Sequence, residues 1–182
     1  MLAAAIAAHA TILLPFSLTE SSPTYNRVTS FEQGTTPSLS MNTGTVYQAI
    51  PFTLSSESNI TLSLQQADGA DLNNWDVDTF LTLYSTFDPA DATRGAIMAN
   101  DDFASTLSRI ETTSPLAAGD YTVVVTAFEV GSYTGGEEGD GSPLPWSGSI
   151  ALNITAIPEP STYALCAGIL TLGFVAWRRR RT

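Results

Sequence analysis

Five oxygen-bearing side chains in the middle of the chain are the residues best able to do chemistry. Two precede the apolar run 79–84 and three follow the shorter run 95–99. If the two runs pair as an antiparallel hairpin across the loop 85–94, the chain returns to its starting level and the five side chains meet at one end of a sheet. The first two are two residues apart, so they project from one face of a strand. The set is Asp76, Asp78, Asn100, Asp101 and Asp102.

This acidic cluster predicts a calcium site. Four carboxylates held at one sheet end repel one another and raise each other's pKa values, and a cation relieves that repulsion. Calcium takes six to eight oxygen ligands, of the kind that carboxylates and an asparagine amide supply. The spacing is not that of an EF-hand loop. The alternative is an acidic strand end and a solvated turn, because Asp and Asn are ordinary turn residues.

The remaining domain lacks the side chains of most catalytic sites. The only histidine is His9 and the only cysteine is Cys166, both in the terminal segments, and the chain has no lysine. This excludes Ser-His-Asp and Cys-His nucleophiles, zinc held by His or Cys, and Schiff bases. Adjacent carboxylates such as Glu137 and Glu138 are seldom held at a fixed separation across a cleft, as a glycosidase requires. We therefore predict that the protein is not an enzyme.

The charge also excludes one class of partner. Residues 1–156 hold 17 acidic residues and three arginines, which gives 3 − 17 = −14. Such a domain repels phosphate backbones, so we expect no nucleic-acid binding.

Three loop aromatics suggest a second kind of site. Trp75, Tyr133 and Trp146 could stack on the apolar faces of sugar rings. The alternative is that they cap the ends of the core.

Short runs with alternating polarity predict the fold. Ile60, Leu62 and Leu64 alternate with polar residues, and other strands are expected near 50–54, 79–84, 95–99, 107–112, 120–128 and 149–155. Pro51 suggests an edge or bulge. No window of the domain has helical periodicity with caps. Seven or eight short strands predict an all-β, antiparallel β-sandwich.

The last 26 residues form a separate segment, 157–182. Pro158-Glu159-Pro160 is followed by an apolar helix from Tyr163 to Trp177 and by an arginine block, Arg178, Arg179, Arg180 and Arg181. Fifteen helical residues span about 22 Å, short of the ~30 Å hydrocarbon core. The basic block should stay in the cytoplasm. The segment is either a processing signal, with a transient transmembrane helix, or a plain single-pass anchor.

At the other end, residues 1–10 have the features of a signal-peptide remnant. Leu2 to Ala8 is apolar, and Ala8-His9-Ala10 fits a signal-peptidase site. The basic n-region is missing, which suggests that Met1 lies inside a longer leader. The alternative is a short apolar segment of the mature domain. We predict that residues 11–47 form an N-terminal segment, with the first strands among them.

The order of Pro-Glu-Pro, short apolar helix and arginine block resembles the PEP-CTERM sorting tag of Gram-negative bacteria. The resemblance implies export, transient insertion in the inner membrane, and cleavage near Pro-Glu-Pro by an exosortase-type membrane protease. The mature protein is then expected at the cell surface or outside the cell.

Residues 48–155 resemble bacterial pre-peptidase C-terminal domains. The resemblance rests on Asp76 to Tyr84, Ile97 to Asp102 and Leu116 to Val125. It implies a jelly-roll-like sandwich that serves secreted proteins as an accessory module. In some members of that family, the end of the sandwich that corresponds to the acidic cluster holds calcium. The sequence therefore predicts a non-catalytic surface or extracellular-matrix protein. The alternative is a carbohydrate-binding module for extracellular polysaccharide.

Overall fold

The computed structural model describes residues 8–41, 43–66, 79–101, 108–127, 145–158, 168–169, 171–172 and 177–179. Within these ranges the domain is all-β. The strands are β1 (His9–Leu18), β2 (Thr24–Tyr25), β3 (Thr45–Leu54), β4 (Ser58–Gln66), β5 (Thr79–Tyr84), β6 (Ala96–Asn100), β7 (Arg109–Glu111), β8 (Gly119–Ala127) and β9 (Trp146–Ala156).

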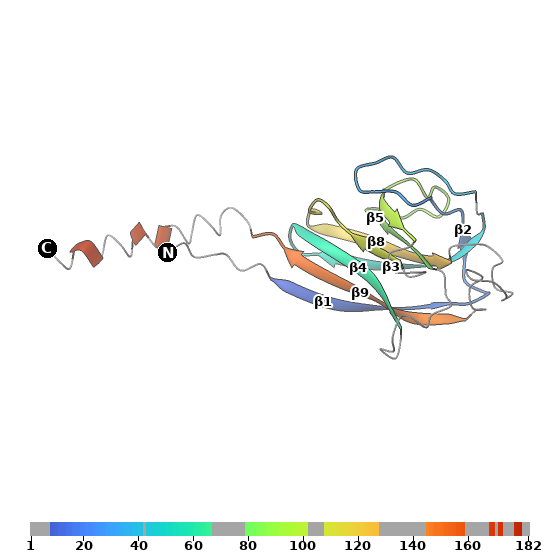
Figure 1. Ribbon diagram of the computed structural model, residues 1–182, viewed down its shortest axis with the longest axis horizontal. Coiled ribbons are helices and arrows are strands. Elements are labelled where there is room, and N and C mark those ends of the chain that lie inside the picture. Colours follow the sequence, from blue (N-terminus) through green and yellow to red (C-terminus); the bar gives the residue numbers. More distant parts are fainter. Residues whose placement is uncertain are drawn as a thin grey trace.

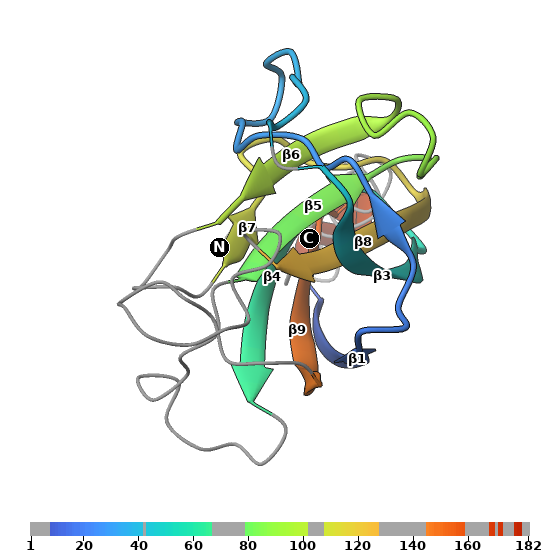
Figure 2. The ribbon, with the colours of Figure 1, turned by 90° about the vertical axis from the view of Figure 1, so that its right-hand side faces the viewer.

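The strands form two antiparallel sheets, which confirms the predicted all-β, sandwich-like fold. One sheet has the order β1-β9-β4-β7 and the other β2-β3-β8-β5-β6. In Figure 1, β1 and β9 run side by side in the lower layer, below β3, β8 and β5. Figure 2 shows the same layers from one end.

The main core fills the space between the sheets. Period-two alternation puts Ile60, Leu62 and Leu64 of β4 on the inner face, opposite Val123 and Val125 of β8. Each fully buried aliphatic side chain contributes roughly 1.5–3 kcal/mol. Strands are present where the pattern predicted them, and two are longer than predicted: β3 begins at Thr45 instead of residue 50, and β9 begins at Trp146 instead of residue 149.

Pro51 lies where β3 has a partner on one side only. Among the described residues, β2 pairs with Thr45 and Val46, whereas Pro51 is opposite Thr122 of β8. The predicted edge position is confirmed, because a proline without an N–H is tolerated at a free edge.

The N-terminal segment supplies more of the fold than predicted. β1 pairs with β9 from His9–Thr155 to Leu18–Trp146, and its alternate residues Leu14, Phe16 and Leu18 are buried in the main core. The strand begins at His9, inside the predicted leader remnant 1–10.

The connection between β2 and β3 covers the outer face of the five-stranded sheet (Figure 2). Phe31 bridges to Ala99 of β6, and a second buried cluster gathers Tyr25, Val28, Phe80 and Tyr84. This cover explains why β5 is buried at every position.

Beyond Pro158, the described residues of the C-terminal segment, 168–169, 171–172 and 177–179, are helical. Among the residues that the structure describes, no helix combines the length and the hydrophobicity of a membrane span. Most of the predicted helix, Tyr163 to Trp177, lies outside the described residues.

Candidate functional site

The hairpin on which the predicted metal site depends is present. β5 and β6 pair antiparallel, with Leu81 opposite Asn100 and Leu83 opposite Met98. Asp101 follows directly, so the chain returns toward the start of β5 as expected from the sequence.

Asn100 and Asp101 are the two predicted ligands within the described residues. The Asp101 carboxylate oxygen Oδ1 accepts a hydrogen bond of 3.0 Å from the Ser30 hydroxyl. The Asn100 amide Nδ2 donates to the Arg109 carbonyl oxygen at 2.8 Å, which leaves the amide oxygen as the group suited to a cation. Asp76, Asp78 and Asp102 lie outside the described residues. Within the described ranges, no three His, Cys, Asp or Glu side chains form a group that could hold a metal ion.

The start of β5 is fixed against the other sheet. The Ser108 hydroxyl donates to the Thr79 carbonyl oxygen at 2.6 Å, and the Ser108 N–H donates to the Thr79 hydroxyl at 3.2 Å. Leu64 N–H in turn donates to the Ser108 carbonyl at 3.5 Å. Because Leu64 lies in the half of β4 away from Ala156, β5 begins toward the end of the sandwich opposite the C-terminal exit.

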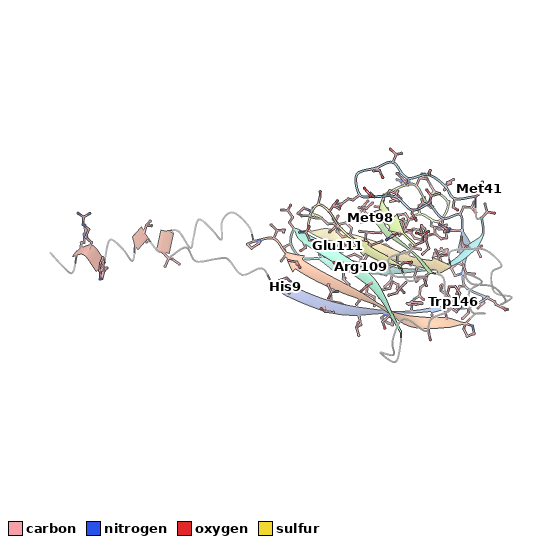
Figure 3. The ribbon with its side chains drawn as sticks, viewed as in Figure 1. His9, Met41, Met98, Arg109, Glu111 and Trp146 are labelled. Atoms are coloured by element: carbon pink, nitrogen blue, oxygen red, sulfur yellow. The ribbon has the colours of Figure 1, made fainter. Side chains whose placement is uncertain are left out.

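An arginine lies closer to the acidic turn than its sequence position suggests. Arg109 of β7 contacts Asn100 through its carbonyl oxygen, while its guanidinium pairs with Glu111 at 2.8 Å (Figure 3). Arg109 follows Asp102 by seven residues in the sequence, and the approach of β7 to β6, which depends on tertiary structure, brings its backbone to Asn100.

Of the predicted sugar contacts, only Trp146 is within the described residues. Its side chain is 5% exposed and packs in the main core, at the opposite end of β9 from His9 and its partner Thr155 (Figure 3). This position matches the alternative role, a residue that caps the core. Trp75 and Tyr133 lie outside the described residues.

The second buried cluster, on the outer face of the five-stranded sheet, is called the outer core below. It contains a group of buried hydroxyls that the sequence did not predict. The hydroxyls of Tyr25, Thr82 and Tyr84 are buried and interact with one another, yet none has full hydrogen-bond geometry to a described residue. Burial raises the pKa of Tyr25 to about 12, against partial compensation from the neighbouring hydroxyls, and also raises the pKa of Tyr84. The Arg27 guanidinium stacks at 4.0 Å over the Phe80 ring. Neutral tyrosines of this kind offer no base at neutral pH.

The C-terminal end of β9 is held on both sides. Ala156 N–H donates to the Ala8 carbonyl at 3.0 Å, and Ile157 N–H donates to the Glu57 carbonyl at 2.8 Å. Pro158 follows and has no N–H to continue the ladder. The predicted sorting residues Arg178 and Arg179 are helical, and Glu159, Pro160, Arg180 and Arg181 lie outside the described residues.

The segment that begins at this strand end matches a known signal. The family model of the PEP-CTERM protein-sorting motif matches residues 156–181. The chain carries a PEP-CTERM sorting motif. Such tags are recognised by exosortase, a membrane protease, so the motif implies export and processing at the membrane. The predicted sorting segment, 157–182, is confirmed within one residue at each end.

No curated protein matches the chain. The likeness of residues 48–155 to pre-peptidase C-terminal domains therefore stays a prediction.

Proposed function

We propose that this protein is a non-catalytic β-sandwich which exosortase delivers to the cell surface or the extracellular matrix. The observation that carries the proposal is the PEP-CTERM motif at residues 156–181, which starts at the last residue of β9. The folded domain thus passes directly into its sorting signal, as expected of a cargo domain with a removable tag.

The chemistry of the domain supports a non-catalytic role. Residues 11–156 contain no histidine, cysteine or lysine, so acyl transfer through a His-activated nucleophile and amine catalysis have no side chain to use. The tyrosines with raised pKa values are buried in the outer core, away from solvent.

We further propose that the end of the sandwich near Asn100 and Asp101 binds calcium, with Asp76, Asp78 and Asp102 as the other ligands. The observed β5–β6 pairing supports this, because it returns Asp101 toward the start of β5. A jelly-roll-like architecture of the pre-peptidase C-terminal type is part of the same proposal.

Expression of the full chain in cells with and without exosortase tests the sorting role. With the protease, mass spectrometry of surface and secreted fractions should find no peptide from Tyr163 to Thr182. Without it, intact chains should accumulate in the membrane fraction. A variant with Pro158→Ala and Glu159→Gln should behave like the protease-deficient cells, whereas Thr162→Ser, a matched change beside the signal, should be processed normally.

Stable membrane-bound chains that end in Thr182 in exosortase-positive cells would refute the sorting role in favour of a plain anchor. A glycan array with residues 11–157 tests the other half of the proposal. Saturable binding that Trp75→Ala abolishes would identify a carbohydrate-binding module.

A further inference from the structure

β9, the strand that precedes the tag, is hydrogen-bonded to a neighbouring strand on each side along most of its length. β9 pairs with β1 over its whole length up to Thr155 and with β4 from Gly148 to Ala156. Local opening of a strand with partners on both sides costs nearly as much free energy as global unfolding. Residues 146–156 are therefore inaccessible to a protease while the sandwich is folded.

Backbone hydrogen bonds from β9 to its neighbours extend one residue beyond the strand, to Ile157. Ile157 N–H donates to the Glu57 carbonyl oxygen at 2.8 Å, whereas Pro158 has no N–H to donate. Glu57 belongs to the mature domain, so this bond survives leader removal. The contact of Ala156 with Ala8 does not survive if the leader is cut after Ala10.

We propose that the sorting cut falls on the tag side of Ile157 and that the folded end of β9 slows it. This inference rests on the proposed exosortase processing. Proteases bind their substrates as extended segments, and here the residues just before the signal are already committed to backbone hydrogen bonds. Binding of the protease around the cut therefore requires that Ala156 and Ile157 first break their backbone hydrogen bonds.

The first test is the C terminus of the mature protein from exosortase-positive cells, measured by intact-mass and C-terminal peptide analysis. The expected mature chain retains Ile157. A mature chain that ends at or before Ala156 would overturn the proposal, whereas a chain that is never cut would instead refute the sorting role.

The second test is kinetic. Insertion of Gly-Ser-Gly-Ser between Ile157 and Pro158 gives the protease a free segment without any change in the core. Pulse-chase should then show the intact chain disappearing roughly fivefold to thirtyfold faster, the change expected when one or two backbone hydrogen bonds need not open.

Two controls separate this effect from general loosening of the domain. The same four residues inserted after Gly34, in an exposed turn with φ 85°, should leave the processing rate unchanged. Glu57→Ala should also leave it unchanged, because the contact with Ile157 uses the carbonyl oxygen of residue 57. A linker after Ile157 that fails to accelerate processing would overturn the proposal.

Discussion

At the scale of single residues, Asp101 is the most informative position in the candidate metal site. Its carboxylate accepts a hydrogen bond from Ser30, and an asparagine at this position can accept the same bond. Asp101→Asn therefore removes the charge while it keeps a local contact.

Calcium should stabilise the domain if the five predicted ligands meet. At a hundredfold excess over the dissociation constant, the gain is about 2.7 kcal/mol, or a rise in melting temperature of roughly 5–10 °C. Magnesium should do less, because it dehydrates reluctantly. Asp101→Asn should abolish most of the calcium response in thermal melts.

Glu20→Gln is the matched control, since it removes one carboxylate from the exposed turn after β1. It should leave the calcium response intact. If neither millimolar calcium nor chelator changes the melting temperature, the cluster does not bind calcium and is an ordinary acidic turn.

The buried tyrosines predict a loss of stability at alkaline pH. The pKa of Tyr25 rises from 10.0 to about 12 on folding, so the unfolded chain loses its proton first as pH increases. Tyr25 therefore leaves the free energy of unfolding unchanged below pH 10. As pH rises from 10 toward 12, it lowers the free energy of unfolding by about 2–3 kcal/mol. Urea unfolding at pH 8, 10 and 11 should show this fall.

Tyr25→Phe should make that fall in stability smaller, and the part that comes from Tyr84, whose pKa burial also raises, should remain. Tyr121→Phe is the control, because the Tyr121 hydroxyl donates to the Ala117 carbonyl in an exposed setting. Tyr121→Phe should leave the fall in the free energy of unfolding above pH 10 unchanged. An equal reduction of that fall by both variants would show that Tyr25 does not cause it.

At the scale of elements, the sequence predicted the strands that alternate with a period of two. It placed the first strands within residues 11–47 but did not locate β1, whose pattern follows an apolar run. The β5–β6 hairpin was predicted to within one residue. Leu14, Phe16 and Leu18 also alternate, but the apolar residues before them suggested a leader, and Ile12 is 43% exposed in the structure. The cover over β5 was beyond prediction, because the contact of Phe31 with Ala99 joins segments far apart in sequence.

The contribution of β1 predicts where the folding unit begins. A chain of residues 11–157 should unfold cooperatively in urea, whereas residues 48–157 should not fold. The shorter chain loses Leu14, Phe16 and Leu18 from the core. At roughly 1.5–3 kcal/mol each, these three side chains match much of a typical domain's stability of about 5–15 kcal/mol. Cooperative unfolding of the shorter chain, followed by circular dichroism, would place the boundary at residue 48 instead.

At the scale of the whole molecule, the lack of lysine makes maturation directly measurable. The chain has no lysine, so the α-amino group at the N terminus of the mature protein is its only amine, whether or not the predicted leader is removed. An amine-reactive probe should label the mature protein once, on a peptide that begins at Thr11. A labelled peptide that begins at or before His9 would show that the mature domain keeps the whole of β1.

The sorting tag and the candidate calcium site lie toward opposite ends of the sandwich. His9 and Ala156 lie together where the chain enters and leaves, and β5 begins toward the other end. Processing therefore concerns one end of the domain, and the candidate calcium site lies toward the other.

The two-sided pairing of β9 also determines how the domain responds to a mechanical load. A pull on Pro158 is directed along β9, whereas antiparallel hydrogen bonds lie perpendicular to their strands. The bonds to β1 and β4 are thus loaded in shear and share the force, instead of opening one after another. A domain tethered through its C-terminal end would resist drag at the cell surface through the same strand that limits access to its tag.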